Sequence, residues 1–443
     1  MSAIAQVLRH EGQAVRGSDR GRDRGENREL YEALAAQEIA LYAQDGSGVD
    51  PEVDEVVVSS AVEETVPDVR AALRLGVSIR NRAQVLAWLF NRGEGVAVGG
   101  TSGKTTVTGM VGHILREAGR NPTVINGGMM LNAVDPPFLG NAVCGDSNLP
   151  VIEADEHDGT IALYHPAVAV LTNISLDHKS LEELRPLFRE FCRRARKAVV
   201  VNLDCAESVA LIKAHPNRVT FGMANGRADF YAEEVEALRE GVRFRVSGVG
   251  FHLQVPGRHN VSNALAAAAA CGAFGVPVEV SAEALSGFLG IQRRLQVVGR
   301  VQGVTVIDDF AHNPEKVTAS LETLKAHPGR LLVMFQLHGY GPTRFLKEGL
   351  ISAFAEGLED TDLLLMPEIY FAGGTAQKDI SARDLVDAIA RQGCRAEFVP
   401  DREAIARRFI EVAGPGDRVV VMGARDDTLA EFARGVVEGI GKR

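Results

Sequence analysis

Short apolar runs alternate with amphipathic stretches along the first part of the chain. Gln13–Asp19 and Glu55–Ser60 have the pattern of strands, whereas Arg28–Ala36 and Pro67–Leu75 repeat apolar positions at helical spacing. A polar break at Asn91–Glu94 follows. The alternation predicts a small domain with a parallel sheet over residues 1–93.

The same alternation continues twice more and predicts two further α/β domains, at residues 94–289 and 290–443. The middle domain is expected to contain a helix of small residues at Asn260–Phe274 and strands at Gly95–Val98, Val151–Ala154, Ala167–Asn173 and Lys197–Asn202. The last domain is expected to contain strands at Val304–Asp308, Arg330–Gln336, Leu363–Pro367 and Arg418–Met422. The predicted fold class is therefore α/β, with three domains.

Composition and charge argue against several classes of function. The net charge of −10, from 48 basic and 58 acidic side chains, argues against a nucleic-acid surface, which needs clustered Lys and Arg. No apolar run has the length of a membrane span and the first residues lack the order of a signal peptide, so we expect a cytoplasmic protein without membrane insertion. The five cysteines are scattered and predict no zinc or redox motif.

A glycine-rich segment between a predicted strand and a predicted helix has the residues of a phosphate-binding loop. In this context backbone N–H groups and the helix N-terminus hold phosphate oxygens, a lysine reaches the β- and γ-phosphates, and a hydroxyl binds Mg²⁺. Val98 stands where the strict motif has glycine, but the shorter variant fits. The residues expected to bind ATP are Gly100, Thr101, Ser102, Gly103, Lys104, Thr105 and Thr106. The loop alone does not separate a ligase from a kinase or a hydrolase.

Acidic residues and a histidine follow the next two strands. Glu153, Asp155, Glu156 and Asp158 come at the end of one strand, and His178 follows another. Because ligands of open α/β sheets bind at the carboxyl ends of the strands, one of these acids and His178 are candidate magnesium ligands. An acidic turn is also common wherever a loop meets water, so the segment taken alone leaves both interpretations open.

Five segments in this order resemble the Mur ligase family: the phosphate loop, the two segments above, Pro256–Ala264, and Asp308–Pro314. The resemblance covers essentially the whole chain. It implies an N-terminal Rossmann-like domain that binds a UDP-linked muramyl substrate, a central P-loop ATPase domain and a C-terminal Rossmann-like domain that binds an amino acid.

The resemblance also implies roles for single residues. Lys104 resembles the phosphate-contacting lysine, Thr105 and Glu153 resemble magnesium ligands, and His178 resembles the histidine at a second metal. Residues that resemble nucleotide contacts are Asn260 and Asn263 on the adenine side, Arg294 near the phosphates, and Asp309. His312 resembles a substrate contact, and either His312 or His338 is the candidate base for the incoming amine.

The branch of the family that joins L-alanine to UDP-N-acetylmuramate through an acyl phosphate, in peptidoglycan synthesis, shares further features. Asp19, Ser59 and Ser60 match its substrate-binding segments, and Phe335–His338 matches another. Arg193 and Arg194 stand in the region where other branches carry a carbamylated lysine. Two alternatives stay open: a branch that attaches a preformed peptide during wall recycling, and a catalytically idle paralogue that binds nucleotide.

Three departures from that branch concern the substrates. The glycine-rich turn that cradles the UDP pyrophosphate precedes, in that branch, the position of Met1, so we expect either a start codon assigned too late or the loss of the standard way of holding UDP. Arg344 alone remains of several arginines near the amino acid, where a guanidinium pairs with the carboxylate. The turn Gly423–Asp426 is more charged than the glycine-rich turn expected, and the sequence offers no reason for it.

Overall fold

The computed structural model describes residues 1–443 except 60–62, 157–158, 176–179, 213–214, 239–240, 372–376 and 427. The chain forms two compact units. Unit 1 comprises Met1–Glu236, Val242–Gln254 and His259–Ile291, and unit 2 comprises Ala237–Gly241, Val255–Arg258 and Gln292–Arg443. The segment 1–93, which we expected to form a domain of its own, packs in unit 1 with most of the predicted central domain.

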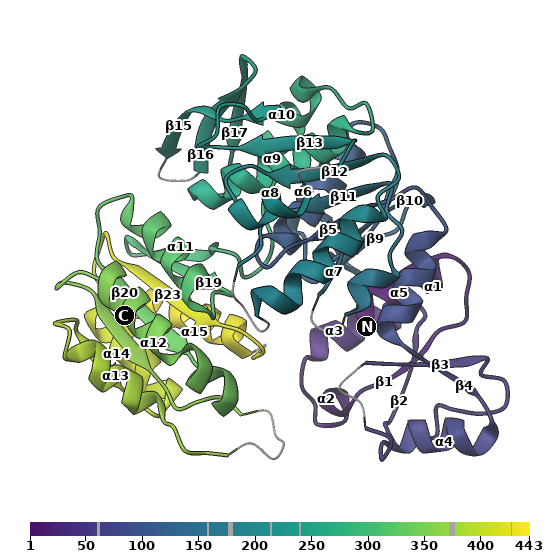
Figure 1. Ribbon diagram of the computed structural model, residues 1–443. Helices are drawn as coiled ribbons and strands as arrows, with labels where there is room; N and C mark the ends of the chain where they lie inside the picture. Colours follow the sequence, from purple (N-terminus) through teal and green to yellow (C-terminus); the bar gives the residue numbers. More distant parts are fainter. Residues whose placement is uncertain are drawn as a thin grey trace. The chain divides into compact units, whose positions relative to one another are not determined.

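The N-terminal part of unit 1 carries two parallel strand pairs, β1 with β2 and β3 with β4, in its described residues (Figure 1). Apolar residues of the first and last helices, among them Ile4 and Phe90, join the same buried cluster as Ala97 of the central sheet. This shared core is why the segment belongs to unit 1. Its elements are α1 (Ser2–His10), β1 (Arg16–Ser18), α2 (Arg20–Asp23), α3 (Arg28–Ala36), β2 (Ala40–Tyr42), β3 (Glu55–Val58), α4 (Pro67–Leu75), β4 (Ser78–Asn81) and α5 (Arg82–Asn91).

An eight-stranded sheet forms the centre of unit 1, in the order β14-β13-β12-β11-β5-β10-β6-β9. All neighbours pair in parallel except β9, which is antiparallel to β6. The central strands are buried on both faces, as their continuous apolar runs require. The strands are β5 (Val96–Gly99), β6 (Pro122–Ile125), β9 (Ala142–Val143), β10 (Asp146–Glu153), β11 (Val168–Leu171), β12 (Ala198–Asn202), β13 (Arg218–Gly222) and β14 (Phe230–Tyr231).

Helix α9 (Arg258–Gly272) is the predicted helix of small residues, and it is among the most deeply buried elements of unit 1. It lies beside α6 (Lys104–Glu117), where the Cys271 thiol is 3.9 Å from the carbonyl of Val111. Alanines on every face permit this close approach. The other helical elements of unit 1 are α7 (Leu181–Arg193), α8 (Ala206–Ile212), α10 (Val278–Ser286), η1 (Leu131–Ala133) and η2 (Thr160–Leu163).

Two antiparallel features outside the eight-stranded sheet of the central region were not predicted. One is the three-stranded sheet β15-β16-β17, at Glu233–Leu238, Gly241–Val246 and Val249–Leu253. Its signal is present in the sequence, because buried Val242 and Phe244 alternate with exposed Arg243 and Arg245. The other is a hairpin of β7 (Val134–Asp135) and β8 (Phe138–Leu139).

Unit 2 is built on a six-stranded sheet in the order β18-β19-β23-β20-β21-β22. β18 is antiparallel to β19 and the remaining neighbours are parallel. The strands are β18 (Gln296–Val301), β19 (Val304–Asp309), β20 (Leu331–Gln336), β21 (Leu363–Met366), β22 (Ala396–Phe398) and β23 (Arg418–Gly423), and the helices are α11 (Pro314–Lys325), α12 (Tyr340–Gly357), α13 (Ala382–Ala390), α14 (Arg402–Val412) and α15 (Thr428–Gly441). The four predicted strands are present, and β18 and β22 are additional.

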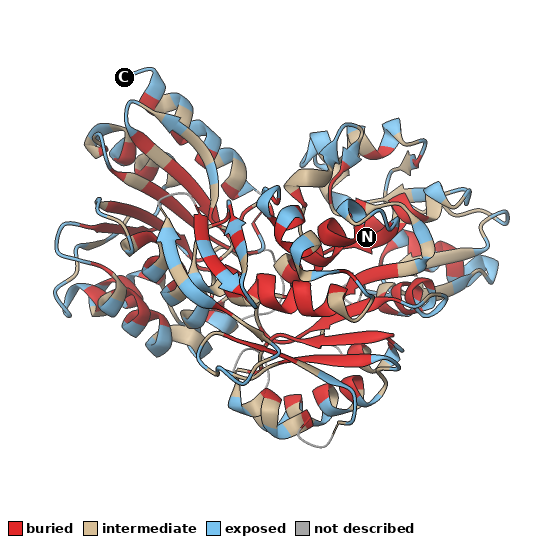
Figure 2. Cartoon of the chain, turned by 90° about the horizontal axis from the view of Figure 1, so that it is seen from above, coloured by how far each residue is buried: buried red, intermediate tan, exposed pale blue. Residues whose placement is uncertain are grey.

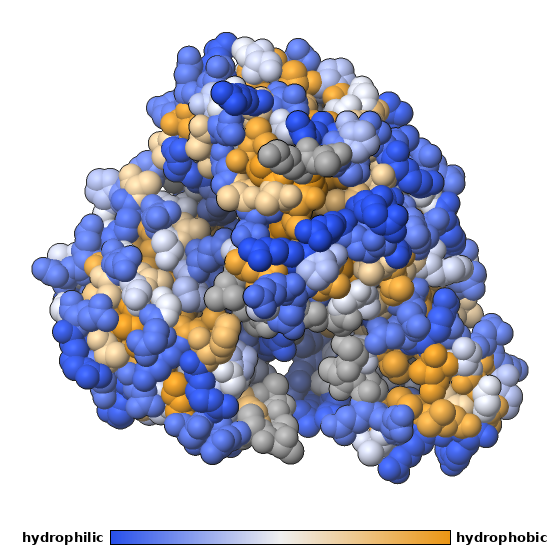
Figure 3. All heavy atoms as spheres, in the orientation of Figure 1, coloured by the Kyte–Doolittle hydropathy of each residue, from blue (hydrophilic) through white to orange (hydrophobic). Residues whose placement is uncertain are grey.

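Burial and surface character agree with this layered construction. The central strands of the two large sheets are coloured as buried in Figure 2, and the outer faces of helices are coloured as exposed. The face shown in Figure 3 is predominantly hydrophilic, with smaller apolar areas. In the part of the chain that is described, no helix combines the length and apolar character of a membrane span.

The packing of α9 leads to a prediction about stability. Ala267 is fully buried, so Ala267→Leu forces extra methyl groups into a filled space and lowers the free energy of unfolding by about 1–3 kcal/mol. Urea denaturation followed by circular dichroism measures this loss. Ala35→Leu, at an exposed position of α3, is the matched control and leaves the midpoint within error. Equal midpoints for both variants would contradict the tight packing of α9.

Candidate active site

The phosphate loop joins β5 to α6 in unit 1. Gly100 and Gly103 have φ of 131° and 85°, which side chains rarely adopt, and a Cβ on either would collide with a neighbour. On Gly100 it would lie 2.1 Å from the hydroxyl of Thr172, and on Gly103 it would lie 2.5 Å from Oδ1 of Asn263. The backbone therefore approaches its surroundings as closely as a phosphate-binding loop requires.

Lys104 is the first residue of α6, and its ammonium is buried. Nζ donates to the carbonyl of Gly100 at 2.8 Å and to Oε2 of Glu156 at 2.7 Å, forming an ion pair with a carboxylate that is also buried. Burial by itself would lower the pKa of Lys104, but the charges of Glu156, Glu153 and Asp155 outweigh it and raise the pKa. Lys104 is therefore a fixed positive charge at the start of the helix.

Thr105 and Glu153, the two predicted metal ligands in the described region, lie together. The hydroxyl of Thr105 donates to both carboxylate oxygens of Glu153, at 2.9 and 3.0 Å. The turn after β6 holds this pair, because the Gly127 N–H donates to Glu153 at 3.0 Å and the Asn126 amide donates to the carbonyl of Thr105 at 3.1 Å. A hydroxyl beside a carboxylate is the oxygen-only donor set that suits Mg²⁺.

The loop is braced by residues that follow β11. The side-chain oxygen of Asn173 accepts from the Thr101 hydroxyl at 2.7 Å and from the Ser102 N–H at 2.9 Å. The hydroxyl of Thr172 donates to the carbonyl of Ser102 at 2.6 Å. The Ser102 hydroxyl is itself buried and has no hydrogen-bond partner in the described residues. A buried polar atom of this kind indicates that the loop is built to receive a polar ligand.

The predicted asparagines of α9 are both buried, and Nδ2 of Asn263 donates to Oδ1 of Asn260 at 3.0 Å. The closeness of Asn263 to Gly103 places it at the phosphate loop. Thr106, also predicted to bind ATP, is half-buried on the first turn of α6. Contact of these residues with the nucleotide stays a prediction.

Four predicted positions lie elsewhere or cannot be placed. His178 and Ser60 fall outside the described residues. The carboxylate of Asp19 accepts from the Gly21 N–H at 2.7 Å and so caps α2, while Ser59 is half-buried after β3. None of these contacts involves the phosphate loop. Binding of the substrate by Asp19 and Ser59 stays a prediction.

In unit 2, the pair Arg293 and Asp308 connects three segments at the carboxyl edge of the sheet. Nε of Arg293 lies 3.2 Å from both carboxylate oxygens of buried Asp308, and its other nitrogens donate to the carbonyls of Gly423 and Asp426 at 2.9 and 3.2 Å. The sequence assigned a role to Arg294 and none to Arg293. The guanidinium of Arg294 lies 4.7 Å from the centre of the Phe310 ring.

Asp309 ends β19 and is buried. One carboxylate oxygen accepts from the Leu295 N–H at 3.2 Å and the other accepts a short hydrogen bond from the Ser320 hydroxyl. Asp309 therefore positions the chain around Leu295 and the helix α11. Its contact with the nucleotide stays a prediction.

His312 and His338 follow β19 and β20, and their rings lie 5.6 Å apart, edge to face. Burial lowers the pKa of His312 to about 3, with smaller effects of Lys316, His338 and Arg294 in the same direction. Nδ1 of His312 lies 2.8 Å from the carbonyl of Phe310. Because a carbonyl only accepts, Nδ1 carries the proton and Nε2 carries the lone pair of a neutral imidazole.

Arg344, predicted to pair with the carboxylate of the amino acid, lies on the first part of α12. Its guanidinium forms an ion pair with Asp379 and donates to the carbonyl of Gln377 at 3.0 Å. The side chain therefore fastens the segment around residue 378 to the helix. A contact of Arg344 with an amino acid stays a prediction, although an internal carboxylate already occupies the guanidinium.

The turn Gly423–Asp426, for which the sequence offered no reason, is tightly held. Buried Asp426 accepts from the N–H and hydroxyl of Thr428 at 3.1 and 2.6 Å and forms an ion pair with Arg402. Arg402 also donates to Oε1 of Gln336, the last residue of β20, with Nε at 2.9 Å. These contacts join β20, β23 and the first residue of α14.

Local spacing did not reveal several of these residues. Glu156 stands in the acidic segment that was singled out, but its pairing with Lys104 depends on two loops meeting. Asn126 and Gly127 had a usable signal, because they follow an apolar strand directly. The network of Arg402, Gln336 and Asp426 had none, since its members are far apart in the sequence.

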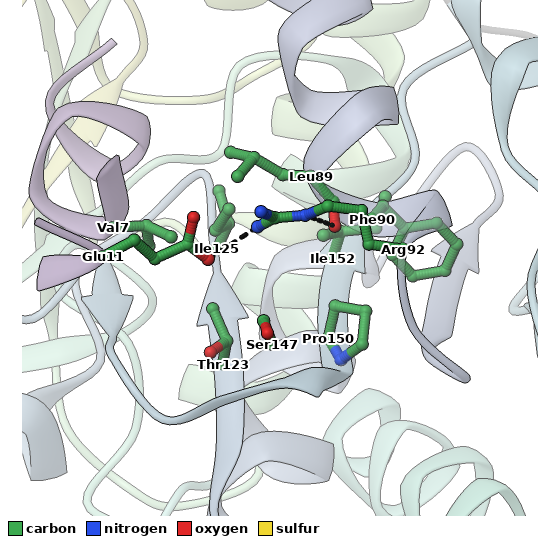
Figure 4. Close-up of a pocket in the computed structure, with 10 residues that line it drawn as sticks. All are labelled: Val7, Glu11, Leu89, Phe90, Arg92, Thr123, Ile125, Ser147, Pro150 and Ile152. Carbon is green, nitrogen blue, oxygen red and sulfur yellow. Dashed lines mark hydrogen bonds and ion pairs between the residues drawn. The ribbon is translucent and has the colours of Figure 1, made fainter. Parts of the chain in front are cut away.

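A small hollow in unit 1 lies apart from the phosphate-loop residues (Figure 4). An ion pair of 2.6 Å between Glu11 and Arg92 spans it, as Figure 4 shows. It is lined by Val7, Glu11, Leu89, Phe90, Arg92, Thr123, Ile125, Ser147, Pro150 and Ile152. Half of these are apolar residues of the shared core, so the hollow is part of the packing between the N-terminal helices and the sheet.

Comparison with known proteins identifies the family. Three family models match in order: "Mur ligase family, catalytic domain" at residues 1–94, "Mur ligase middle domain" at 98–271, and "Mur ligase, glutamate ligase domain" at 293–425. The chain belongs to the Mur ligase family. The resemblance on which the sequence motifs were interpreted, and the three-domain α/β fold class that it implied, are confirmed.

Two relatives of this Mur ligase with similar length share one name. A UDP-N-acetylmuramate–L-alanine ligase of Pelotomaculum thermopropionicum is 34% identical over 96% of this chain and 92% of its own. One of Anaeromyxobacter dehalogenans is 38% identical over 97% and 93%. Both alignments span nearly the whole of each protein.

Solved structures agree with this assignment of the fold. The structure of a UDP-N-acetylmuramate–alanine ligase from Thermotoga maritima has a TM-score of 0.82 and 26% identity, covering 99% of this chain and 96% of that chain. A murein peptide ligase from Psychrobacter arcticus has a TM-score of 0.70 at 22% identity, covering 100% and 97%. At 22% identity, the second match supports only the fold of this Mur ligase and not its activity.

The first prediction from the site concerns Gly103. Gly103→Ala places a Cβ 2.5 Å from Oδ1 of Asn263 at a φ of 85°, so the loop must shift, and we expect the affinity for ATP to fall at least about tenfold. Calorimetric titration with a non-hydrolysable ATP analogue measures it. Gly119→Ala, at a φ of 71° with nothing within 4 Å, is the control for backbone strain and binds normally. Equal affinities would show that the contact with Asn263 is unimportant.

The buried imidazole of His312 makes the free energy of unfolding depend on pH. His312 has a pKa of about 3 when folded and about 6.5 when unfolded, so below pH 6.5 the unfolded chain binds a proton that the folded chain refuses. Stability from this residue is complete above pH 6.5 and is lost as the pH falls toward 3, by about 1–2 kcal/mol at pH 5.

Urea midpoints at pH 7.5 and pH 5 test the effect of His312. We expect His312→Asn, which removes the titrating ring, to lose less stability between these two values than the unaltered protein. His252→Asn at an exposed position is the control. If His312→Asn has the same pH dependence as the unaltered protein, the imidazole is not kept neutral by burial.

Proposed function

We propose that this chain is an ATP-dependent ligase that joins L-alanine to the carboxylate of UDP-N-acetylmuramate in peptidoglycan precursor synthesis, in the cytoplasm. The observation that carries the proposal is the buried Lys104 at the start of α6, beside the pair Thr105 and Glu153. The alanine ligases of similar length, with identities of 34% and 38%, support the choice of substrates.

In the first step, the substrate carboxylate attacks the γ-phosphate of ATP and gives an acyl phosphate and ADP. Lys104, kept protonated by the surrounding carboxylates, stabilises the negative charge that develops on the transferring phosphoryl group. The N–H groups of the loop, with the Ser102 hydroxyl, supply further donors. Asn173 keeps these donors in place before the nucleotide binds.

The residues present fit a magnesium ion. In the described part of the chain no three His, Cys, Asp or Glu side chains form a metal cluster, but Mg²⁺ with a nucleotide needs only one or two protein oxygens. Thr105 and Glu153 would hold it, with His178 as a further candidate. When bound, Mg²⁺ neutralises charge on the phosphate oxygens.

In the second step, the amine attacks the acyl carbonyl, and collapse of the tetrahedral intermediate releases inorganic phosphate. The amine must lose a proton on the way. A base with a pKa of about 3, like His312, accepts protons poorly at neutral pH. We therefore assign the proton transfer to His338 and give His312 the role of holding the neighbouring ring.

The experiment measures phosphate release and product mass with ATP, Mg²⁺, UDP-N-acetylmuramate and L-alanine. We expect Lys104→Met to lower kcat by at least about 10²–10³-fold, because it removes a charge that acts in the transition state. Lys442→Met, at an exposed lysine near the end of α15, is the control with unchanged kcat.

Two outcomes separate the alternatives. Phosphate release with a preformed peptide and none with L-alanine would replace the proposal with the peptide-attaching activity. ATP binding without phosphate release for any amine would leave a nucleotide-binding protein that is not a ligase.

A further inference from the structure

Arg425 stands at the centre of the carboxyl edge of the sheet in unit 2. β23 lies between β19 and β20, with Met422 level with Asp309 and Gly423 level with Gln336. Counting on from these pairs, Arg425 is three residues past Met422, as His312 is three past Asp309. It is two past Gly423, as His338 is two past Gln336. Arg425 and the two histidines therefore follow three neighbouring strands of the sheet, each within three residues of paired positions.

The backbone on both sides of Arg425 is fixed. Arg293 donates to the carbonyls of Gly423 and Asp426, and the buried Asp426 carboxylate is held by Thr428 and Arg402. These polar groups stabilise the turn. A side chain that leaves such a turn starts from a preorganised position.

The Arg425 side chain is exposed, and no hydrogen bond, ion pair or ring contact is found for it among the residues described. Its φ is 60°, in the left-handed region that glycine adopts freely and other residues adopt at a cost. A strained backbone at the edge of a candidate site is a reason to look for a function of the side chain.

The other arginine considered for the amino acid has a partner within the protein. The guanidinium of Arg344 is paired with Asp379. Binding a substrate there would first require breaking that pair. Arg425 meets no such competition from the described residues, and it lies in the turn after β23, the strand between those that lead to His312 and His338.

We propose that Arg425 binds the α-carboxylate of the incoming amino acid and thereby selects free amino acids over amides and peptides. The inference rests on the proposed ligase function. A guanidinium pairs with a carboxylate through two parallel hydrogen bonds, which a neutral amide does not reproduce. In a free α-amino acid the carboxylate and the amine share one carbon, so under this proposal Arg425 holds the carboxylate and directs the amine toward His338.

The experiment compares L-alanine with L-alaninamide at saturating ATP and UDP-N-acetylmuramate. Arg425→Gly removes the guanidinium and suits the left-handed backbone. We expect it to raise the KM for L-alanine about 10- to 100-fold, with kcat and the KM for L-alaninamide nearly unchanged. Arg425→Lys keeps the positive charge but cannot form the two parallel hydrogen bonds. We therefore expect its KM for L-alanine to lie between those of Arg425→Gly and the unaltered protein. Gln302→Gly, at an exposed position with a φ of 50° in the turn between β18 and β19, is the control for relief of backbone strain.

The outcomes distinguish the inference from the function on which it rests. An unchanged KM for L-alanine in an active Arg425→Gly ligase overturns the inference and leaves the ligase function intact. An equal rise in KM for both amines also overturns it, because the residue then only shapes the turn. If the unaltered protein forms no amide with any amine, the ligase function fails and the inference falls with it.

Discussion

The burial of the Lys104 ammonium is the constraint on which the site in unit 1 depends. An isolated ammonium in such surroundings would lose its proton, so carboxylates must be brought to it from another strand. Glu156 supplies the direct contact, and Glu153 contributes from a position where it also binds the Thr105 hydroxyl. One arrangement of charges therefore keeps the lysine protonated and places the donors for a metal ion next to it.

This arrangement is possible because the loops after β5, β6, β10 and β11 leave the same edge of a parallel sheet. Each loop contributes one element of the site: the phosphate loop, Asn126, Glu153 with Glu156, and Asn173. None of these residues makes the site alone. Asn173 braces the loop, and Asn126 and Gly127 hold the pair Thr105 and Glu153 in place.

Unit 2 also contains a buried cation that is paired with a carboxylate, the guanidinium of Arg293. Arg293 pairs with Asp308 and uses its remaining donors on two carbonyls of the turn after β23. Because that turn follows the strand between those that lead to His312 and His338, the guanidinium of Arg293 fixes the backbone on both sides of Arg425. The charges of this turn therefore have a structural explanation. Buried Asp426 anchors the backbone, and the side chain of Arg425 is exposed to solvent.

The sequence by itself determined the elements with strong local signals: the buried strands, the alanine-rich helix α9, the phosphate loop and the acids that follow β10. These depend on neighbours in the chain, through periodicity, glycine conformation and the turn after each strand. Only the tertiary structure decided which charges meet: Glu156 with Lys104, Arg293 with Asp308, and Arg402 with Asp426. Such pairs join segments distant in sequence, and strand order and register, which no local pattern encodes, set the distance between them.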